Sequence, residues 1–236
     1  MIEEHFLQSK HIDDQRRVWL HRSDDADARD CLLFLDGELY RDRVKAPAIL
    51  EEASNRKLLP PVHAVFVSSV SAKDRQLDFI CNSAYAAFVA EEVTAWIKQQ
   101  GLSSDRLYLC GLSLSGLQAL FAARAHPDVF DGVLSQSPSA WWNDEQVVSI
   151  FSSHSSNCPP AWVSVGLQER DEDVRHPPTD LHQKTSQLDS VRRLVEQMRT
   201  AGADVRLHEY DGGHDCACWG EELVSAIAWL VRFPKP

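Results

Sequence analysis

Positive charge is scarce in this 236-residue sequence, which has 24 Lys and Arg residues against 35 Asp and Glu residues and a formal net charge of −11. The longest basic runs are the pairs Arg16-Arg17 and Arg192-Arg193. Binding to nucleic-acid phosphates depends on clustered Lys and Arg. The composition therefore argues against a nucleic-acid partner.

Long apolar runs are also missing, and none approaches the length of a membrane span. The N-terminal stretch "MIEEHFLQSKHIDD" is acidic and polar, whereas a secretory signal has a basic start and an apolar core. From these two absences we expect a soluble, cytoplasmic protein without a membrane partner.

The cysteines follow no disulfide framework. The six of them, at positions 31, 81, 110, 158, 216 and 218, are spread through the chain, and we expect reduced thiols. His214, Cys216 and Cys218 alternate over five residues, which is tighter than common zinc motifs, and no C-x-x-C pair occurs elsewhere. We therefore expect no metal and no other cofactor.

Strand-like and helix-like segments alternate along the chain. With 44% hydrophobic residues, the sequence suits one well-filled domain over residues 1–236. Strands alternating with helices predict an α/β fold with a mostly parallel sheet covered on both faces. The expected strands are 16–22, 31–37, 62–70, 106–111, 132–137, 161–166 and 204–210, and the expected helices are 46–59, 83–101, 115–127, 190–202 and 221–233.

The segment "RLYLCGLSLSGLQALFAARAHP" carries the strongest catalytic signal. A strand runs into Gly111 and Ser113 and then directly into a helix, which is the setting of a nucleophile elbow. Ser115 stands where this turn usually has glycine. We interpret Ser113 as a nucleophile. The alternative is a serine that only caps the helix.

His214 is the candidate general base because it follows the strand "DVRLHEY" across the turn "DGG". The two glycines allow a sharp turn at the strand end, from which the imidazole can reach Ser113. A serine hydroxyl needs such a base to become a good nucleophile. The order serine, acid, histidine also fits this fold.

Four carboxylates follow the strand "AWVSVG", at positions 169, 171, 172 and 173. Glu169 comes first, within the turn, and is the favoured third member of a triad, with Asp171 as the alternative. Its carboxylate would hold the imidazole tautomer and stabilise the imidazolium. The long polar loop 167–186 suits a segment that faces the substrate or closes over it.

Acyl transfer also requires N–H donors for the developing oxyanion. The backbone N–H of Leu114, directly after the nucleophile, is the first candidate. The second is the N–H of Glu38 in "FLDGELYRD", after an early strand. Trp142 and Trp219 could line an aromatic acyl pocket, although Trp219 could equally fill the core.

Five segments, "LLFLDGELY", "GLSLSGLQAL", "VFDGVLSQSPSAWW", "VGLQER" and "DGGHDCACWGEEL", resemble the signature segments of the enterochelin esterases, in the esterase D-like branch of the α/β-hydrolases. The resemblance implies an α/β-hydrolase fold and the catalytic residues Ser113, His214 and Glu169. It also implies hydrolysis of the ester bonds of a cyclic catecholate siderophore. "KDRQLDFICN" resembles the substrate-side segment of the family, which makes Arg75 a candidate contact for an anionic ligand.

Two features differ from the family pattern. One is Ser115 in the elbow. The other is the separate N-terminal domain of the larger enterochelin esterases, for which we expect no counterpart because the first strand is predicted near Arg16. The alternatives to a siderophore esterase are a hydrolase of smaller esters, an acyltransferase of the same fold, and a non-catalytic ligand-binding relative.

Overall fold

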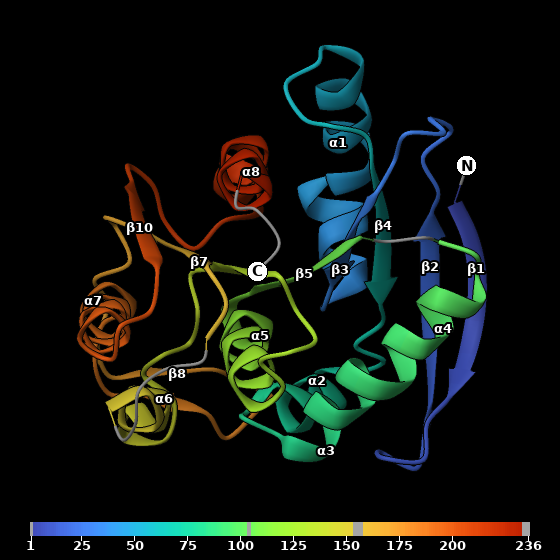
Figure 1. The fold of residues 1–236 in the computed structure, drawn as a ribbon. Helices are drawn as coiled ribbons and strands as arrows, with labels where there is room; N and C mark the ends of the chain where they lie inside the picture. Colours follow the sequence, from blue (N-terminus) through green and yellow to red (C-terminus); the bar gives the residue numbers. More distant parts are fainter. Residues whose placement is uncertain (1, 103–104, 153–157, 233–236) are drawn as a thin grey trace.

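The computed structural model describes residues 2–102, 105–152 and 158–232, and its centre is an eight-stranded sheet (Figure 1). The strand order is β1-β2-β4-β3-β5-β6-β7-β10. β1 pairs antiparallel with β2, and β2 pairs antiparallel with β4. The other neighbouring strands, in the order β4-β3-β5-β6-β7-β10, pair parallel. The bounds are β1 Ile2–Gln8, β2 Gln15–His21, β3 Asp30–Phe34, β4 Val62–Val67, β5 Arg106–Leu112, β6 Gly132–Gln136, β7 Ala161–Gly166 and β10 Val205–Tyr210, with the small hairpin β8 Val174–Arg175 and β9 His182–Gln183 outside the sheet.

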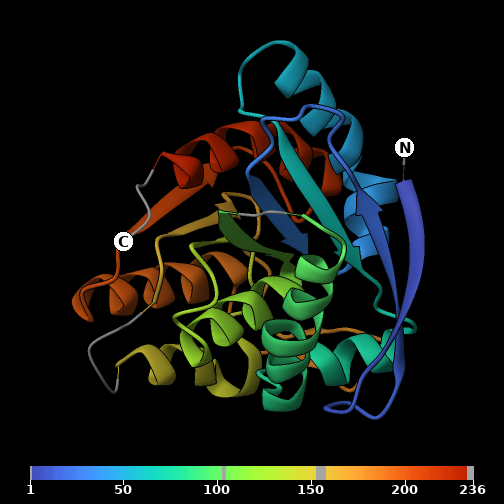
Figure 2. The same ribbon diagram turned by 45° about the vertical axis from the view of Figure 1, so that its right-hand side comes forward.

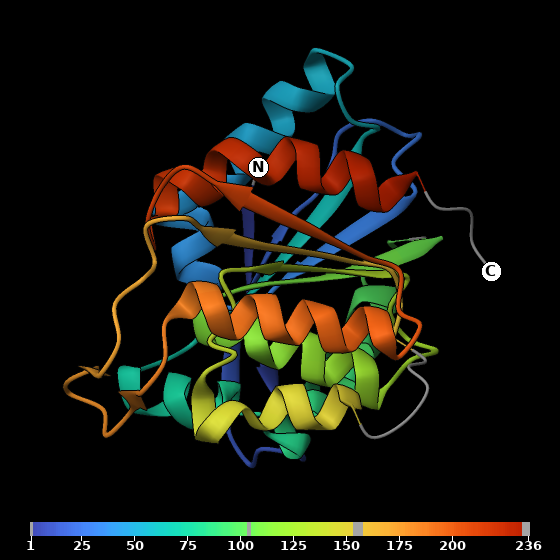
Figure 3. The same cartoon turned by 90° about the vertical axis from the view of Figure 1, so that its left-hand side faces the viewer.

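Helices cover both faces of the sheet (Figure 3). On one face lie η1 and the helices α1 and α8, which contact each other (Figure 2). The other helices lie on the opposite face (Figure 1). Their bounds are η1 Leu39–Val44, α1 Ala46–Asn55, α2 Ala72–Phe79, α3 Ser83–Ala87, η2 Phe88–Val93, α4 Thr94–Gln99, α5 Ser113–Ala125, α6 Trp142–Ser152, α7 Gln187–Thr200 and α8 Cys216–Val231. The expected mostly parallel sheet with helices on both faces is confirmed.

The inner strands are buried on both sides because each face of the sheet has its own apolar core. β4, with the sequence "VHAVFV", is buried at every position. Its Val65 and Val67 pack into the core beneath α3–α7, whereas Ala64 and Phe66 pack into the core beneath α1 and α8. This alternation follows from the two-residue period of a strand.

The first strand differs from the expectation. We predicted it near Arg16, but β1 already begins at Ile2 and pairs with β2 from Ile2↔His21 to Gln8↔Gln15. β1 is an edge strand that alternates between exposed and half-buried positions, so charged residues are tolerated on it. Its polar sequence therefore gave no strand signal.

Three helices also differ from the expectation. The predicted set had no counterpart of α2 or α6, and α8 begins at Cys216, five residues before the expected start at 221. Asp215 caps α8, because its side chain accepts a hydrogen bond from the Ala217 N–H. The last residue of the predicted helix, Phe233, lies outside the described residues.

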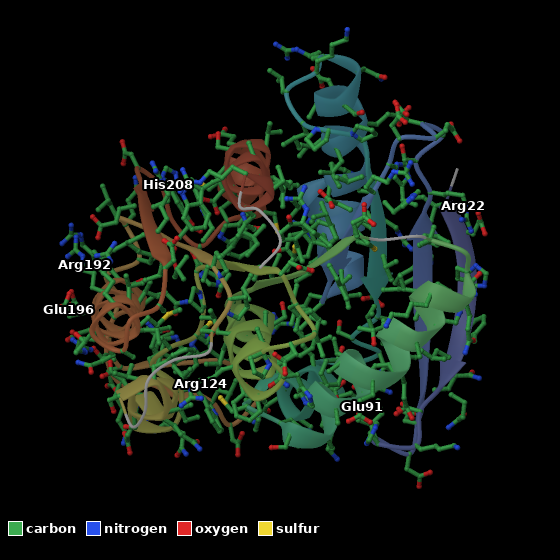
Figure 4. All side chains as sticks on the ribbon, viewed as in Figure 1. Arg22, Glu91, Arg124, Arg192, Glu196 and His208 are labelled. Atoms are coloured by element: carbon green, nitrogen blue, oxygen red, sulfur yellow. The ribbon has the colours of Figure 1, made fainter. Side chains whose placement is uncertain are left out.

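Contacts between helices complete the layer beneath the sheet. Arg124 near the end of α5, labelled in Figure 4, donates from Nη2 to the carbonyl of Ile150 in α6 at 3.1 Å.

None of the helices described in the chain is long and apolar enough to cross a membrane.

Candidate active site

A pocket of about 590 Å³ lies where three strands of the sheet end. Ser113 follows β5, Glu169 follows β7 and His214 follows β10, and all three line this pocket. These strands are parallel and lie within four neighbouring positions of the sheet. Their carboxyl ends therefore meet at one edge, where ligand sites of open α/β sheets form.

Ser113 occupies a strained turn between β5 and α5. Its φ of 54° is in the left-handed region, which is unfavourable for a residue with a side chain. The backbones of β5 and α5 approach closely here, since a Cβ on Gly111 would lie 2.1 Å from the carbonyl oxygen of Ser115. The turn lifts the Ser113 hydroxyl into the pocket, as a nucleophile elbow does.

Ser115, which replaces the usual glycine of the elbow, forms hydrogen bonds with the elbow backbone. Its hydroxyl is fully buried, accepts from the Leu112 N–H at 2.9 Å and donates to the Leu112 carbonyl at 2.8 Å. The side chain thus satisfies two backbone groups at the end of β5. Ser115 therefore stabilises the turn from its buried side, and Ser113 still lines the pocket.

We expect Gly111→Ala to lower the free energy of unfolding by about 3 kcal/mol, because the new methyl group overlaps the backbone of Ser115. Gly213→Ala is the matched control, since a Cβ there meets no heavy atom within 4 Å. Urea unfolding of both variants measures the difference. Equal stability of the two would contradict the close packing of the elbow.

His214 and Glu169 form a short charge-assisted pair, with 2.6 Å between His214 Nδ1 and Glu169 Oε2. The histidine side chain is 42% exposed, and the glutamate side chain is 3% exposed. Ser113 Oγ lies 3.5 Å from Ser139 Oγ. No hydrogen bond joins Ser113 to His214 within the described chain, and such contacts often tighten only when substrate binds.

The second oxygen of Glu169 is held by three donors. Oε1 accepts from the Gly166 N–H at 2.7 Å, the Ser137 hydroxyl at 2.7 Å and the Tyr210 hydroxyl at 3.2 Å. Burial alone would raise the pKa of Glu169, but the bond and charge of His214 and the bonds from Ser137 and Gly166 outweigh it and lower this pKa. The carboxylate is therefore ionised when it faces the imidazole.

Trp219, for which the sequence left a substrate contact and a core position equally open, takes the core position behind the histidine. It is 3% exposed and does not line the pocket. Its ring meets the His214 ring edge-on, with centroids 4.9 Å apart, and its Nε1–H donates to Ser137 Oγ at 3.2 Å and to Tyr210 OH at 3.1 Å. Trp219 thus supports the groups that hold Glu169, because its polar end reaches them from the core.

Trp142, the other expected aromatic contact, is also absent from the pocket lining, and its neighbour Trp141 takes that place. Directly after Trp142 the backbone turns left-handed, at φ values of 49–62° over residues 143–145. The two rings are adjacent in the sequence "AWW", which could not show which of them faces the pocket.

Arg75 does line the pocket, but its charge is already paired. Its guanidinium donates to both oxygens of Asp36 at 2.7–2.9 Å. Asp36 is completely buried and has a φ of 56°. Arg75 is therefore a poorer contact for an anion than an unpaired arginine would be.

The two expected oxyanion donors are placed differently. Leu114 lines the pocket, and as the second residue of α5 its N–H has no intrahelical acceptor. Glu38 does not line the pocket, and its carboxylate accepts from the Ser69 N–H at 3.1 Å. The N–H of Glu38 as second donor stays a prediction.

The loop after β7 faces the pocket, and just over half of the lining residues come from it. It contains the hairpin of β8 and β9. The sequence did not single out His176, Gln183 or Gln187, which line the pocket with it. The full lining is Ala72, Arg75, Ser113, Leu114, Ser139, Trp141, Gln168, Glu169, Asp171, Val174, His176, Pro177, Pro178, Thr179, Leu181, Gln183, Gln187, Gly213 and His214.

The cysteines near His214 belong to the first turns of α8. Cys216 packs against the core beneath α8, and Cys218 lies against the turn at Gly212. Among the described residues, no cluster of His, Cys, Asp and Glu could hold a metal ion. Nδ1 of His214 is occupied by Glu169.

A second buried glutamate, Glu222, lies behind the site on α8. Its carboxylate accepts from Gln136 Nε2 and Ser164 Oγ, both at 2.6 Å, and from Trp162 Nε1 at 3.2 Å. Burial raises the pKa of Glu222 to about 7, although these three bonds lower it. Glu222 thus takes up a proton near neutral pH.

We expect Glu222→Gln to become progressively more stable, relative to the unchanged protein, as the pH rises from 4.5 to 8. The folded pKa near 7 exceeds the ordinary 4.5, so the folded state binds the extra proton in this window and its stability falls as the pH rises. The relative gain is about 3 kcal/mol. Urea unfolding of both proteins across this pH range measures it. A pH-independent difference would contradict the raised pKa.

The chain is similar to known esterases. The model of the family described as "Putative esterase" matches residues 9–230. An iron(III) enterobactin esterase from Dickeya dadantii is 28% identical over 249 residues, which cover 97% of this chain and 54% of the relative. The chain spans about half the length of the curated relatives it matches most fully.

Solved structures share the fold. An enterobactin esterase from Shigella flexneri, crystallised in the presence of 2,3-dihydroxy-N-benzoylserine, gives a TM-score of 0.84 at 24% identity over 98% of this chain and 59% of that chain. A ferulic acid esterase gives a TM-score of 0.77 at 15% identity over 98% of both chains. The chain therefore has the α/β-hydrolase fold and belongs to the esterase family whose model spans residues 9–230.

Proposed function

We propose that this protein is a serine esterase and that its substrate is an ester of a catecholate siderophore, either the cyclic trilactone or its linear products. The observation that carries the proposal is the His214–Glu169 pair of 2.6 Å beside a strained Ser113 in one pocket. Family membership and the names of the enterobactin and salmochelin esterase relatives support the substrate class.

In the first half of the proposed reaction, Ser113 Oγ attacks the ester carbonyl and His214 Nε2 accepts its proton. The negative charge on the former carbonyl oxygen is stabilised by the N–H of Leu114 and by a second donor, for which Glu38 is the candidate. Glu169 stabilises the imidazolium through Nδ1. The alcohol leaves with the proton from His214, and the acyl group stays on Ser113.

In the second half, water replaces the alcohol. His214 Nε2 accepts a proton from the attacking water, and the new oxyanion occupies the same donors. Collapse of this intermediate releases the carboxylic acid and returns the proton to Ser113 Oγ. An acyltransferase would use the same steps with an added alcohol in place of water.

The pocket charge favours a second candidate, a hydrolase of small uncharged aryl esters. Arg75 is the sole Lys or Arg among the described lining residues, and Asp36 pairs with it. Glu169 and Asp171 add negative charge to the same lining. Such a pocket suits an uncharged ester better than an anionic one.

Product chromatography separates these candidates. The protein is incubated with a catecholate trilactone and, in parallel, with simple aryl esters, and Ser113→Ala serves as the control. We expect serine-dependent opening of the trilactone. Cleavage of the aryl esters alone would retain the mechanism and reject the siderophore. Tight binding without turnover would favour a non-catalytic ligand-binding relative.

A further inference from the structure

A second histidine lies in the pocket. His176 sits in the turn between β8 and β9, where its N–H donates to the Leu181 carbonyl at 3.1 Å and its own carbonyl accepts from the Thr179 N–H at 3.0 Å. Both backbone groups of His176 are thus bonded within the hairpin. The turn fixes the point from which the imidazole enters the pocket.

The ring of His176 is held by an aromatic neighbour. It stacks on Trp141, with ring centroids 5.2 Å apart and planes inclined by 6°. Trp141 in turn donates from Nε1 to Oε1 of Gln187, which is 4% exposed and donates to the Pro138 carbonyl at 2.8 Å. The stacked pair is therefore anchored in the buried segment that precedes α6, and little rotation is left to it.

The tautomer of His176 follows from the hydrogen bonds of Gln183. The amide nitrogen of Gln183 donates to the Asp171 carbonyl at 3.0 Å, so the amide oxygen faces His176 Nε2 at 3.2 Å. An oxygen accepts, so Nε2 carries the proton and Nδ1 carries the lone pair. Burial lowers the pKa of His176, so the neutral ring is the form present at neutral pH.

Within the described chain, no residue donates to Nδ1 of His176. His176 lines the pocket, and its Nδ1 is an acceptor on the edge of a fixed aromatic ring. Apolar groups of Trp141, Val174 and Leu181 line the same pocket. A planar ring fits such apolar walls, and a hydroxyl on that ring supplies the donor that Nδ1 lacks.

We propose that His176 is a specificity-determining residue, which selects esters with a hydroxyaryl group by accepting the phenolic O–H at Nδ1. The proposal rests on the proposed esterase function and gives one residue the task of recognising the hydroxylated ring. An ester without the hydroxyl cannot form this hydrogen bond, and the loss of the bond makes the selection.

The test compares two ligands that differ only in their ring hydroxyls, N-(2,3-dihydroxybenzoyl)serine and N-benzoylserine. Calorimetry of the unchanged protein is expected to give at least about fivefold tighter binding of the hydroxylated ligand, the contribution of one hydrogen bond. In His176→Phe the ring remains and the acceptor is lost. We expect the preference to fall to about one while the affinity for N-benzoylserine changes by less than about twofold.

His176→Asn is the rescue variant, because its Oδ1 takes the place of Nδ1 as an acceptor. We expect it to restore most of the preference. His176→Ala provides a second loss of the acceptor should the Phe variant not fold, as judged by thermal unfolding. A preference that persists in the Phe or Ala variant, or that Asn fails to restore, overturns the proposal.

The methyl esters of the same two ligands separate this proposal from the proposed function. If they are hydrolysed, the kcat/KM ratio is expected to follow the binding preference through the same variants. If neither ester is hydrolysed but the binding preference still depends on His176, the esterase proposal fails and the hydroxyaryl site stands.

Discussion

Replacing Ser113 by alanine is expected to lower kcat for ester hydrolysis by about four to six orders of magnitude. Ser113 Oγ is the only group proposed to become acylated, and Ser113 stands on a strained turn in the pocket that His214 also lines. A fluorophosphonate should add to the unchanged protein at Ser113 and should not add to the variant. Initial rates with an aryl acetate and intact-protein mass spectrometry measure both effects.

Ser139→Ala is the matched control for this prediction. Ser139 lines the same pocket, and its Oγ lies 3.5 Å from Ser113 Oγ. At this distance the two hydroxyls form a weak hydrogen bond in which either can be the donor. We expect the variant to retain labelling and most of its turnover. Labelling that survives in Ser113→Ala but is lost in Ser139→Ala would show that Ser139, and not Ser113, is the nucleophile.

The residues that the sequence placed at the site are those whose position follows from local chain geometry. Ser113, Glu169 and His214 each come directly after a predicted strand. Parallel strands end at one edge of a sheet, so three such residues must meet whatever the details of packing. Correct strand assignments were therefore enough to bring these three together before any contact was known.

The side-chain contacts that the sequence misplaced, left open or missed depend on directions set by tertiary packing. Trp141 and Trp142 are adjacent, and Trp141, whose Nε1 donates to Gln187, is the one that lines the pocket. Trp219 lies five residues after His214, in the first turn of α8, and takes the core position, one of the two that the sequence left open. Arg75 reaches the pocket as predicted, but its partner Asp36 lies 39 positions away, and no local pattern indicates that pairing.

Secondary structure was missed where burial is low or the apolar pattern is weak. β1 reads "IEEHFLQ", and as an edge strand it has no fully buried face. α2 reads "AKDRQLDF" and buries only Asp78 and Phe79. Hydrophobic periodicity reports the burial of a face, so elements that bury little give little signal.

Glu169→Gln is expected to lower kcat by about four orders of magnitude although it changes one atom. Three donors surround Oε1, from Gly166, Ser137 and Tyr210, so the amide must place its oxygen there. Its NH₂ then faces His214 Nδ1, at the position where Oε2 now lies 2.6 Å away. Nδ1 must accept from this group, which moves the imidazole proton to Nε2, and Nε2 can no longer take the proton of Ser113.

Asp171→Asn is the control, and it decides between the two acids that follow β7. Asp171 also lines the pocket, but its bond to the site network is through its backbone carbonyl, which Gln183 contacts. We expect this variant to keep most of its turnover, measured as kcat with the same aryl acetate. A large loss in Asp171→Asn and a small one in Glu169→Gln would reverse the assignment. Equal small losses would mean that His214 acts without an acid, because then neither carboxylate fixes its tautomer.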